Sequence, residues 1–149
     1  MSENEKVPWH NKYKIGIENI DEQHHKLFDL VNELYTLNDD QDIKERLRHV
    51  LYEFSDYMKT HFKDEEEYML SIGYPNLEEH KQIHQDIVNN LLKIISTPAK
   101  LNIIKSKMRV VAKRVLIEHI LNEDMKIKLF LFEKGEEEVE EEIFDLGDL

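Results

Sequence analysis

The chain has 149 residues, of which 35% are charged and 40% are apolar, and its formal net charge is -12. This size suits one globular domain with its own core, and the negative charge argues against nucleic acid as a partner. The sequence has no cysteine, which excludes disulfides, thiolate zinc sites and cysteine nucleophiles.

The N-terminal sequence MSENEKVPW lacks the basic and apolar segments of a secretory signal. No apolar run approaches the roughly 20 residues that a membrane-spanning helix requires. We therefore expect a cytoplasmic protein with no membrane partner. Four glycines and three prolines separate long periodic segments, which favours a few long helices over many short strands.

An irregular arm around Trp9 and Gly16 precedes the first predicted helix. Asp21 is the candidate cap of this helix, which extends to about Leu37. The polar cluster at 38–42 then provides a turn and a second cap. The following helix ends before Ser71, and both helices carry apolar residues at the three- and four-residue spacing of one face.

The segment Gly73-Tyr74-Pro75 predicts a helix stop and a restart, with the proline in the new first turn. The third helix extends to the break at Thr97-Pro98, where Thr97 is a candidate cap, and the fourth covers about 101–130. We therefore predict an all-α protein, an antiparallel up-down-up-down four-helix bundle with an irregular N-terminal arm. Residues 1–132 would form this domain, and 133–149 an acidic tail that we interpret as solubilising.

Six polar side chains fall on the predicted inward faces, and every helix contributes at least one. A single core histidine is most often a hydrogen-bonded packing residue, because an unpaired imidazole there costs a few kcal/mol. A whole set at one level of the bundle instead indicates a shared cation. Two pairs are four residues apart, which stacks their side chains on one face. The six are His24, His61, Glu65, His80, His84 and His119.

The fourth helix offers two acids beyond His119. Glu123 follows it by four residues and Asp124 by five. Spacing on an α-helix favours Glu123, although either acid would suit a bridging role. The other histidines lie outside the inward faces, and we interpret them as surface or packing residues: His10, His25 and His49.

The motifs around these residues resemble those of the hemerythrin family over residues 9 to about 130. They are DEQHHKL at 21–27, HFKDEE at 61–66, GYPNLEEHKQIH at 73–84 and HILNED at 119–124. The resemblance implies two non-heme irons that share a bridging oxygen. It also implies the ligands: His80, His84 and His119 for one iron, His24 and His61 for the other, and Glu65 and Asp124 as bridges. It thus selects Asp124 over Glu123, and His24 over His25.

If each iron accepts about six ligands, the implied set leaves one position open, on the iron with two histidines. Dioxygen would bind there reversibly, for storage, delivery or scavenging, in a protein that is not an enzyme. Four apolar residues lie within about one turn of the ligands and are candidates to line the oxygen pocket, although ordinary core packing explains them equally well. They are Leu27, Phe62, Leu116 and Ile120.

Three other interpretations remain open: an oxygen sensor, a di-iron enzyme such as a peroxidase or a nitric-oxide-detoxifying protein, and a zinc module. Ferritin-like oxidases use Glu-x-x-His pairs and several glutamates, whereas this ligand set is rich in histidine, with one Glu and one Asp. Seven ligands also exceed the needs of one tetrahedral zinc. One departure from the family pattern concerns Val115. Many bacterial members resemble WLxxH before the fourth-helix histidine, so we expect faster water entry here.

Overall fold

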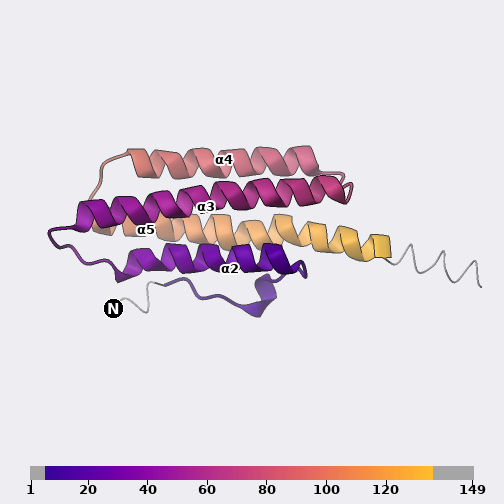
Figure 1. The fold of residues 1–149 in the computed structure, drawn as a ribbon, viewed down its shortest axis with the longest axis horizontal. Helices are drawn as coiled ribbons and strands as arrows, with labels where there is room; N and C mark the ends of the chain where they lie inside the picture. The colour runs from indigo at the N-terminus through magenta and orange to yellow at the C-terminus, as the bar shows by residue number, and fades with distance from the viewer. Residues whose placement is uncertain (1–5, 136–149) are drawn as a thin grey trace, which may run out of the picture.

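The computed structural model describes residues 6–135, and this part of the chain is helical, without strands (Figure 1). Four rods run alternately up and down, which confirms the predicted all-α bundle. The last rod begins as α5, continues through two π-helical segments, η3 and η4, and remains helical over 125–135. The bounds are η1 Asn11–Tyr13, α2 Glu18–Glu33, η2 Leu34–Thr36, α3 Ile43–Ser71, α4 Leu77–Ser96, α5 Leu101–Val111, η3 Ala112–Glu118 and η4 Ile120–Asp124.

The start of α2 differs from the prediction that Asp21 caps it. The helix begins four residues earlier, with Ile17 as its N-cap residue, and Ile17 makes no side-chain cap. Asp21 instead accepts hydrogen bonds from the backbone N–H groups of Ile15, at 2.7 Å, and Gly16, at 3.1 Å. The carboxylate therefore fastens the preceding arm to the first turn of the helix, and Gly16 permits this path with a left-handed φ of 89°.

The turns between the rods follow the sequence signals only in part. Gly73 has a φ of 69° and ends α3, as predicted. Pro75 was expected in the first turn of the next helix, but it precedes the N-cap residue Asn76 and lies in the turn itself. Thr97 is the C-cap residue of α4, and its hydroxyl donates a hydrogen bond to the Lys93 carbonyl at 2.7 Å.

The rods form a closed ring in which each contacts its two neighbours. The pairs α2–α3, α3–α4 and α4–α5 pack together, and α2 closes the ring against η3. The predicted arm lies along α2, where the Val7 backbone exchanges two hydrogen bonds with the Asn32 amide, at 2.7 and 2.8 Å. Trp9 stacks edge-on against Phe28 with ring centroids 5.2 Å apart.

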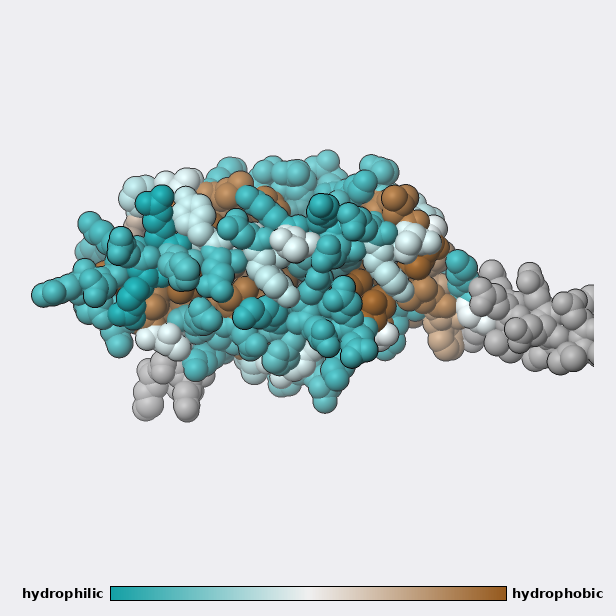
Figure 2. Space-filling view, in the orientation of Figure 1, coloured by the Kyte–Doolittle hydropathy of each residue, from teal (hydrophilic) through white to brown (hydrophobic). Residues whose placement is uncertain are grey.

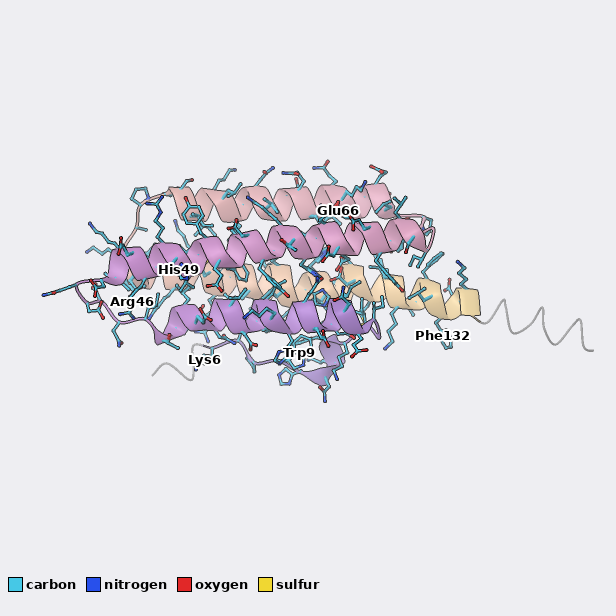
Figure 3. All side chains as sticks on the ribbon, viewed as in Figure 1. Lys6, Trp9, Arg46, His49, Glu66 and Phe132 are labelled. Carbon is cyan, nitrogen blue, oxygen red and sulfur yellow. The ribbon has the colours of Figure 1, made fainter. Side chains whose placement is uncertain are left out.

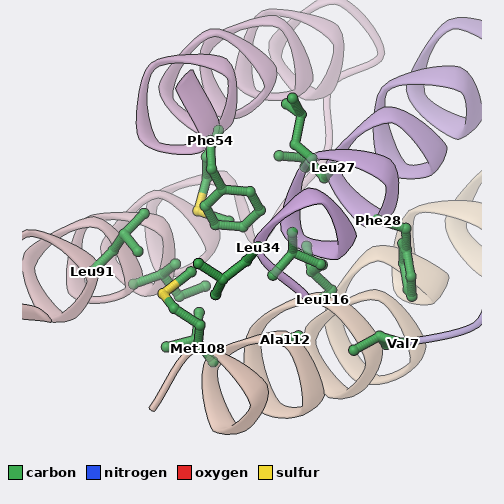
Figure 4. Packing of buried hydrophobic residues seen from close by; sticks show 14 of the residues in the cluster. Val7, Leu27, Phe28, Leu34, Phe54, Leu91, Met108, Ala112 and Leu116 are labelled. Atoms are coloured by element: carbon green, nitrogen blue, oxygen red, sulfur yellow. The ribbon is translucent and has the colours of Figure 1, made fainter. Parts of the chain in front are cut away.

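The apolar interior is divided into two parts by a polar layer. The larger part includes Phe28, Phe54, Leu91 and Met108 (Figure 4), and a smaller one consists of Met69, Tyr74 and Ile127. Within residues 6–135, none of the helices combines the length and apolar character of a membrane-spanning segment. The layer between the two apolar parts contains the candidate site.

Candidate metal centre

All seven side chains implied as metal ligands lie in this one layer. They form two overlapping groups that share both acids, and each side chain is at most 6% exposed. One group contains His80, His84 and His119 with Glu65 and Asp124, and the other contains His24 and His61 with the same two acids.

Helical spacing places most of these residues, but Asp124 depends on a local departure from the α-helix. On an α-helix the fifth residue after His119 would lie roughly 140° around the axis, on another face. Here π-helical segments flank His119, and hydrogen bonds between residues five apart bring Asp124 back to the same face. Asp124 is fully buried, whereas Glu123 lies toward the surface beside Lys126, at 3.4 Å. Asp124, and not the Glu123 that α-helical spacing favours, therefore lies with the histidines of the layer.

Glu65 divides its two oxygens between the two histidine groups. Its Oε1 lies 2.9 Å from His80 Nε2 and 3.1 Å from His84 Nε2. Its Oε2 lies 3.2 Å from His61 Nε2 and 3.5 Å from His24 Nε2. One carboxylate thus faces two separate positions at once.

Asp124, on the rod opposite α3, also points its two carboxylate oxygens toward the two different histidine groups. Its Oδ1 lies 3.0 Å from His80 Nε2 and 3.2 Å from His119 Nε2. Its Oδ2 lies 3.0 Å from His24 Nε2. The two acids therefore bridge a three-histidine side and a two-histidine side.

Several of these buried atoms have no hydrogen-bond partner among the described residues, although they lie so close together. They are both ring nitrogens of His24, His80 Nε2 and all four oxygens of Glu65 and Asp124. Buried polar atoms without partners cost free energy, so such a set is rare in a native core. Imidazole and carboxylate lone pairs that converge on two points suit divalent transition metals.

The electrostatics of the layer also favour cations. Burial disfavours the charged form of His24, but Asp124 and Glu65 outweigh it and raise the pKa of His24 to about 9. The same balance raises the pKa of His80 to about 9. Burial also disfavours ionised Glu65, yet the surrounding imidazoles hold the pKa of its carboxyl well below the usual range. The carboxylates are therefore ionised, which is the state in which they ligate metals.

Two outer hydrogen bonds orient the histidine rings, and the sequence analysis missed both. His61 Nδ1 lies 2.7 Å from Gln23 Oε1, and the Gln23 amide donates to Asp64 at 2.8 Å. His84 Nδ1 lies 3.1 Å from Glu66 Oε2, and Figure 3 labels Glu66 on α3 beside α4. Since these oxygens accept, each Nδ1 carries the proton and each Nε2 points a lone pair at the layer.

The missed residues have a common position in the sequence. Gln23 directly precedes His24, and Glu66 directly follows Glu65. Periodicity assigns such neighbours to a different face, and a half-buried side chain can still reach back to the ring on the next helix. Long polar side chains adjacent to predicted ligands were the available signal.

The four candidate pocket residues are all buried: Leu27, Phe62, Leu116 and Ile120. Phe62 stacks face to face on His84 with ring centroids 3.8 Å apart, which places it against the three-histidine side. Val115 is partly buried and lines a groove of about 480 Å³ that also reaches His119. The histidines interpreted as surface residues, His10, His25 and His49, are exposed.

Comparisons with known proteins agree with this geometry. The profile of the hemerythrin HHE cation binding domain matches residues 15–131. A bacteriohemerythrin of Campylobacter jejuni is 34% identical over 116 residues, which cover 77% of this chain and 87% of the relative. A myohemerythrin of Theromyzon tessulatum is 34% identical over 124 residues, 83% of this chain and 92% of the relative. A hemerythrin-like protein of Naegleria gruberi is 29% identical over 121 residues, 80% and 89% of the two chains.

The matched region includes every residue of the two histidine groups, and it covers most of the chain. On this evidence the chain belongs to the hemerythrin family, with an HHE cation binding domain over residues 15–131.

Proposed function

We propose that this protein binds dioxygen reversibly at a non-heme di-iron centre and serves oxygen storage, delivery or scavenging. The observation that supports it best is the orientation of the two buried carboxylates. Each points one oxygen toward one histidine group and its other oxygen toward the other group. A single-metal site has no use for two acids arranged in this way. Residues 1–132 would form the oxygen-binding domain.

The proposed ligands are the seven side chains of the polar layer. Three histidines would hold one iron and two the other, with Glu65 and Asp124 shared. A ferrous pair would supply the electrons that hold dioxygen, and the two-histidine side would have the vacant position. The Gln23 and Glu66 side chains would keep the His61 and His84 rings in the ligating tautomer.

The surrounding residues suit binding rather than turnover. Within residues 6–135, the buried polar side chains besides the proposed ligands are Ser55, Tyr13, Tyr35 and Tyr74. Tyr74 contacts His80 on the three-histidine side, with ring centroids 6.4 Å apart, and not the two-histidine side proposed for dioxygen. Leu27 and Ile120, each 1% exposed, would exclude water beside it. These observations support the proposed non-enzymatic role.

The test is a visible spectrum of the reduced, iron-loaded protein under nitrogen, then air, then nitrogen again. We expect an oxygen-dependent band that appears and disappears reversibly. Adjacent histidines provide a matched pair of variants: His24→Ala should abolish the band, and His25→Ala should retain it, because His25 is 51% exposed and pairs with Asp29. A band that survives His24→Ala would refute the assignment. Peroxide or nitric-oxide turnover without a reversible band would favour the enzyme alternative.

A further inference from the structure

The final helical turns leave large apolar side chains uncovered. These turns of the last rod extend past the ends of α2, α3 and α4 (Figure 1). On them, the side chains of Leu129 and Phe132 are 59% and 63% exposed. Figure 3 labels Phe132 on these turns, and Figure 2 shows apolar residues gathered at this end of the bundle.

The sequence beyond these turns continues the same pattern. Val139 follows Phe132 by seven residues, and Ile143 and Leu146 follow at steps of four and three. Residues 133–149 contain nine acidic side chains and one lysine. We call 129–146 the acidic segment: an apolar stripe at helical spacing with carboxylates around it.

The outer face of α5 has the opposite charge and a matching stripe. Ile103 and Val110, seven residues apart, are 45% and 51% exposed. Lys107 and Lys113 are exposed beside them, and no ion pair involves either lysine within residues 6–135. Residues 100–114 contain six lysines and arginines and no acid, in a chain of net charge -12. We call this surface, between Ile103 and Ile117, the basic face.

We propose that the acidic segment of one copy docks on the basic face of a second copy, so that the protein forms a symmetric dimer. The two surfaces would match in length, since a helix of 17 residues spans about 26 Å and one of 14 residues about 21 Å. The apolar stripes would cover each other, and the flanking charges would pair across the contact. Two-fold symmetry repeats the contact, which doubles the buried area.

A second copy is required because the segment cannot cover the whole basic face of its own chain. Val110 lies 25 residues before Gly135 on one continuous rod, or about 37 Å. Leu146 lies 11 residues beyond Gly135, so even a fully extended chain spans about 38 Å. The apolar residues of the segment could at best touch the near end of their own basic face, without covering Ile103.

The test is sedimentation velocity of the full chain at low and high salt. We expect twice the monomer mass at low salt and a shift to the monomer in 1 M NaCl, because opposite charges hold the contact. Two variants should each be monomeric at low salt: a chain truncated after Gly135, and the double variant Lys107→Glu, Lys113→Glu. Their equimolar mixture should form a weaker dimer at raised protein concentration, through the single contact between the intact basic face of one variant and the intact acidic segment of the other.

The control is Lys59→Glu, Lys63→Glu, which reverses two exposed lysines on α3 and should leave the dimer intact. Circular dichroism reports whether each variant is folded. A monomeric full chain at low salt would overturn the proposal. So would a truncated chain that remains dimeric, or a mixture that stays monomeric. None of these results depends on iron.

Discussion

The hydrogen bond from Gln23 to His61 allows a quantitative test of how the metal layer is held. In Gln23→Leu the side-chain volume is nearly kept, but the His61 Nδ1–H loses its acceptor at 2.7 Å. His61 is 2% exposed, so water cannot replace the acceptor, and an unsatisfied buried donor costs about 1–3 kcal/mol. The loss of such an outer partner lowers metal affinity by about 10- to 100-fold, which corresponds to about 1.4–2.7 kcal/mol.

The assay is iron retention at rising chelator concentration, measured by elemental analysis after gel filtration. Gln82→Leu is the matched control, because Gln82 lies between two proposed ligands on α4 but is exposed and donates to Asp86 at 3.1 Å. We expect Gln23→Leu to lose iron at a 10- to 100-fold lower chelator concentration than this control. Equal retention by the two variants would show that the hydrogen bond to His61 does not support the site.

The remaining predictions concern the acids, the groove, the metal and one turn. Asp124→Ala should reduce the iron content, whereas Glu123→Ala should leave two irons per chain; the reverse result would refute the π-helical placement. Val115→Trp should fill the groove beside the fourth rod and slow autoxidation, followed as the decay of the oxygenated band; an unchanged rate would exclude this route for water. Chelation should lower the free energy of unfolding by about 4 kcal/mol if iron is present at a thousandfold excess over its Kd, and denaturant titration with and without metal measures this. Gly73→Ala should lower the Tm by about 3 °C, because alanine at a φ of 69° costs about 1 kcal/mol; an unchanged melting curve would contradict it.

Periodicity predicted those parts of the site that regular helices determine. His61 with Glu65, and His80 with His84, are four residues apart, so an ordinary α-helix stacks each pair on one inward face. The alternation of the rods then places these pairs at one level with His24. Long helices, short turns and a polar layer in an apolar interior are sufficient for this part of the prediction.

The rest depended on local structure that periodicity does not encode. The π-helical segments rotate Asp124 inward in place of Glu123, and only the family resemblance had selected the acid that lies in the polar layer. Asp21 has the composition of a helix cap, but its carboxylate serves the preceding arm because the helix begins earlier, at Glu18. Gln23 contributes through a contact between helices, which a stripe on one helix cannot indicate.

Elemental analysis of the purified, iron-reconstituted protein tests the central claim most directly. Seven buried side chains that form two overlapping groups should hold two irons per chain, and this ratio should persist through gel filtration. One metal ion per chain, or a preparation that retains zinc but no iron, would contradict the proposed di-iron centre and the oxygen binding that depends on it.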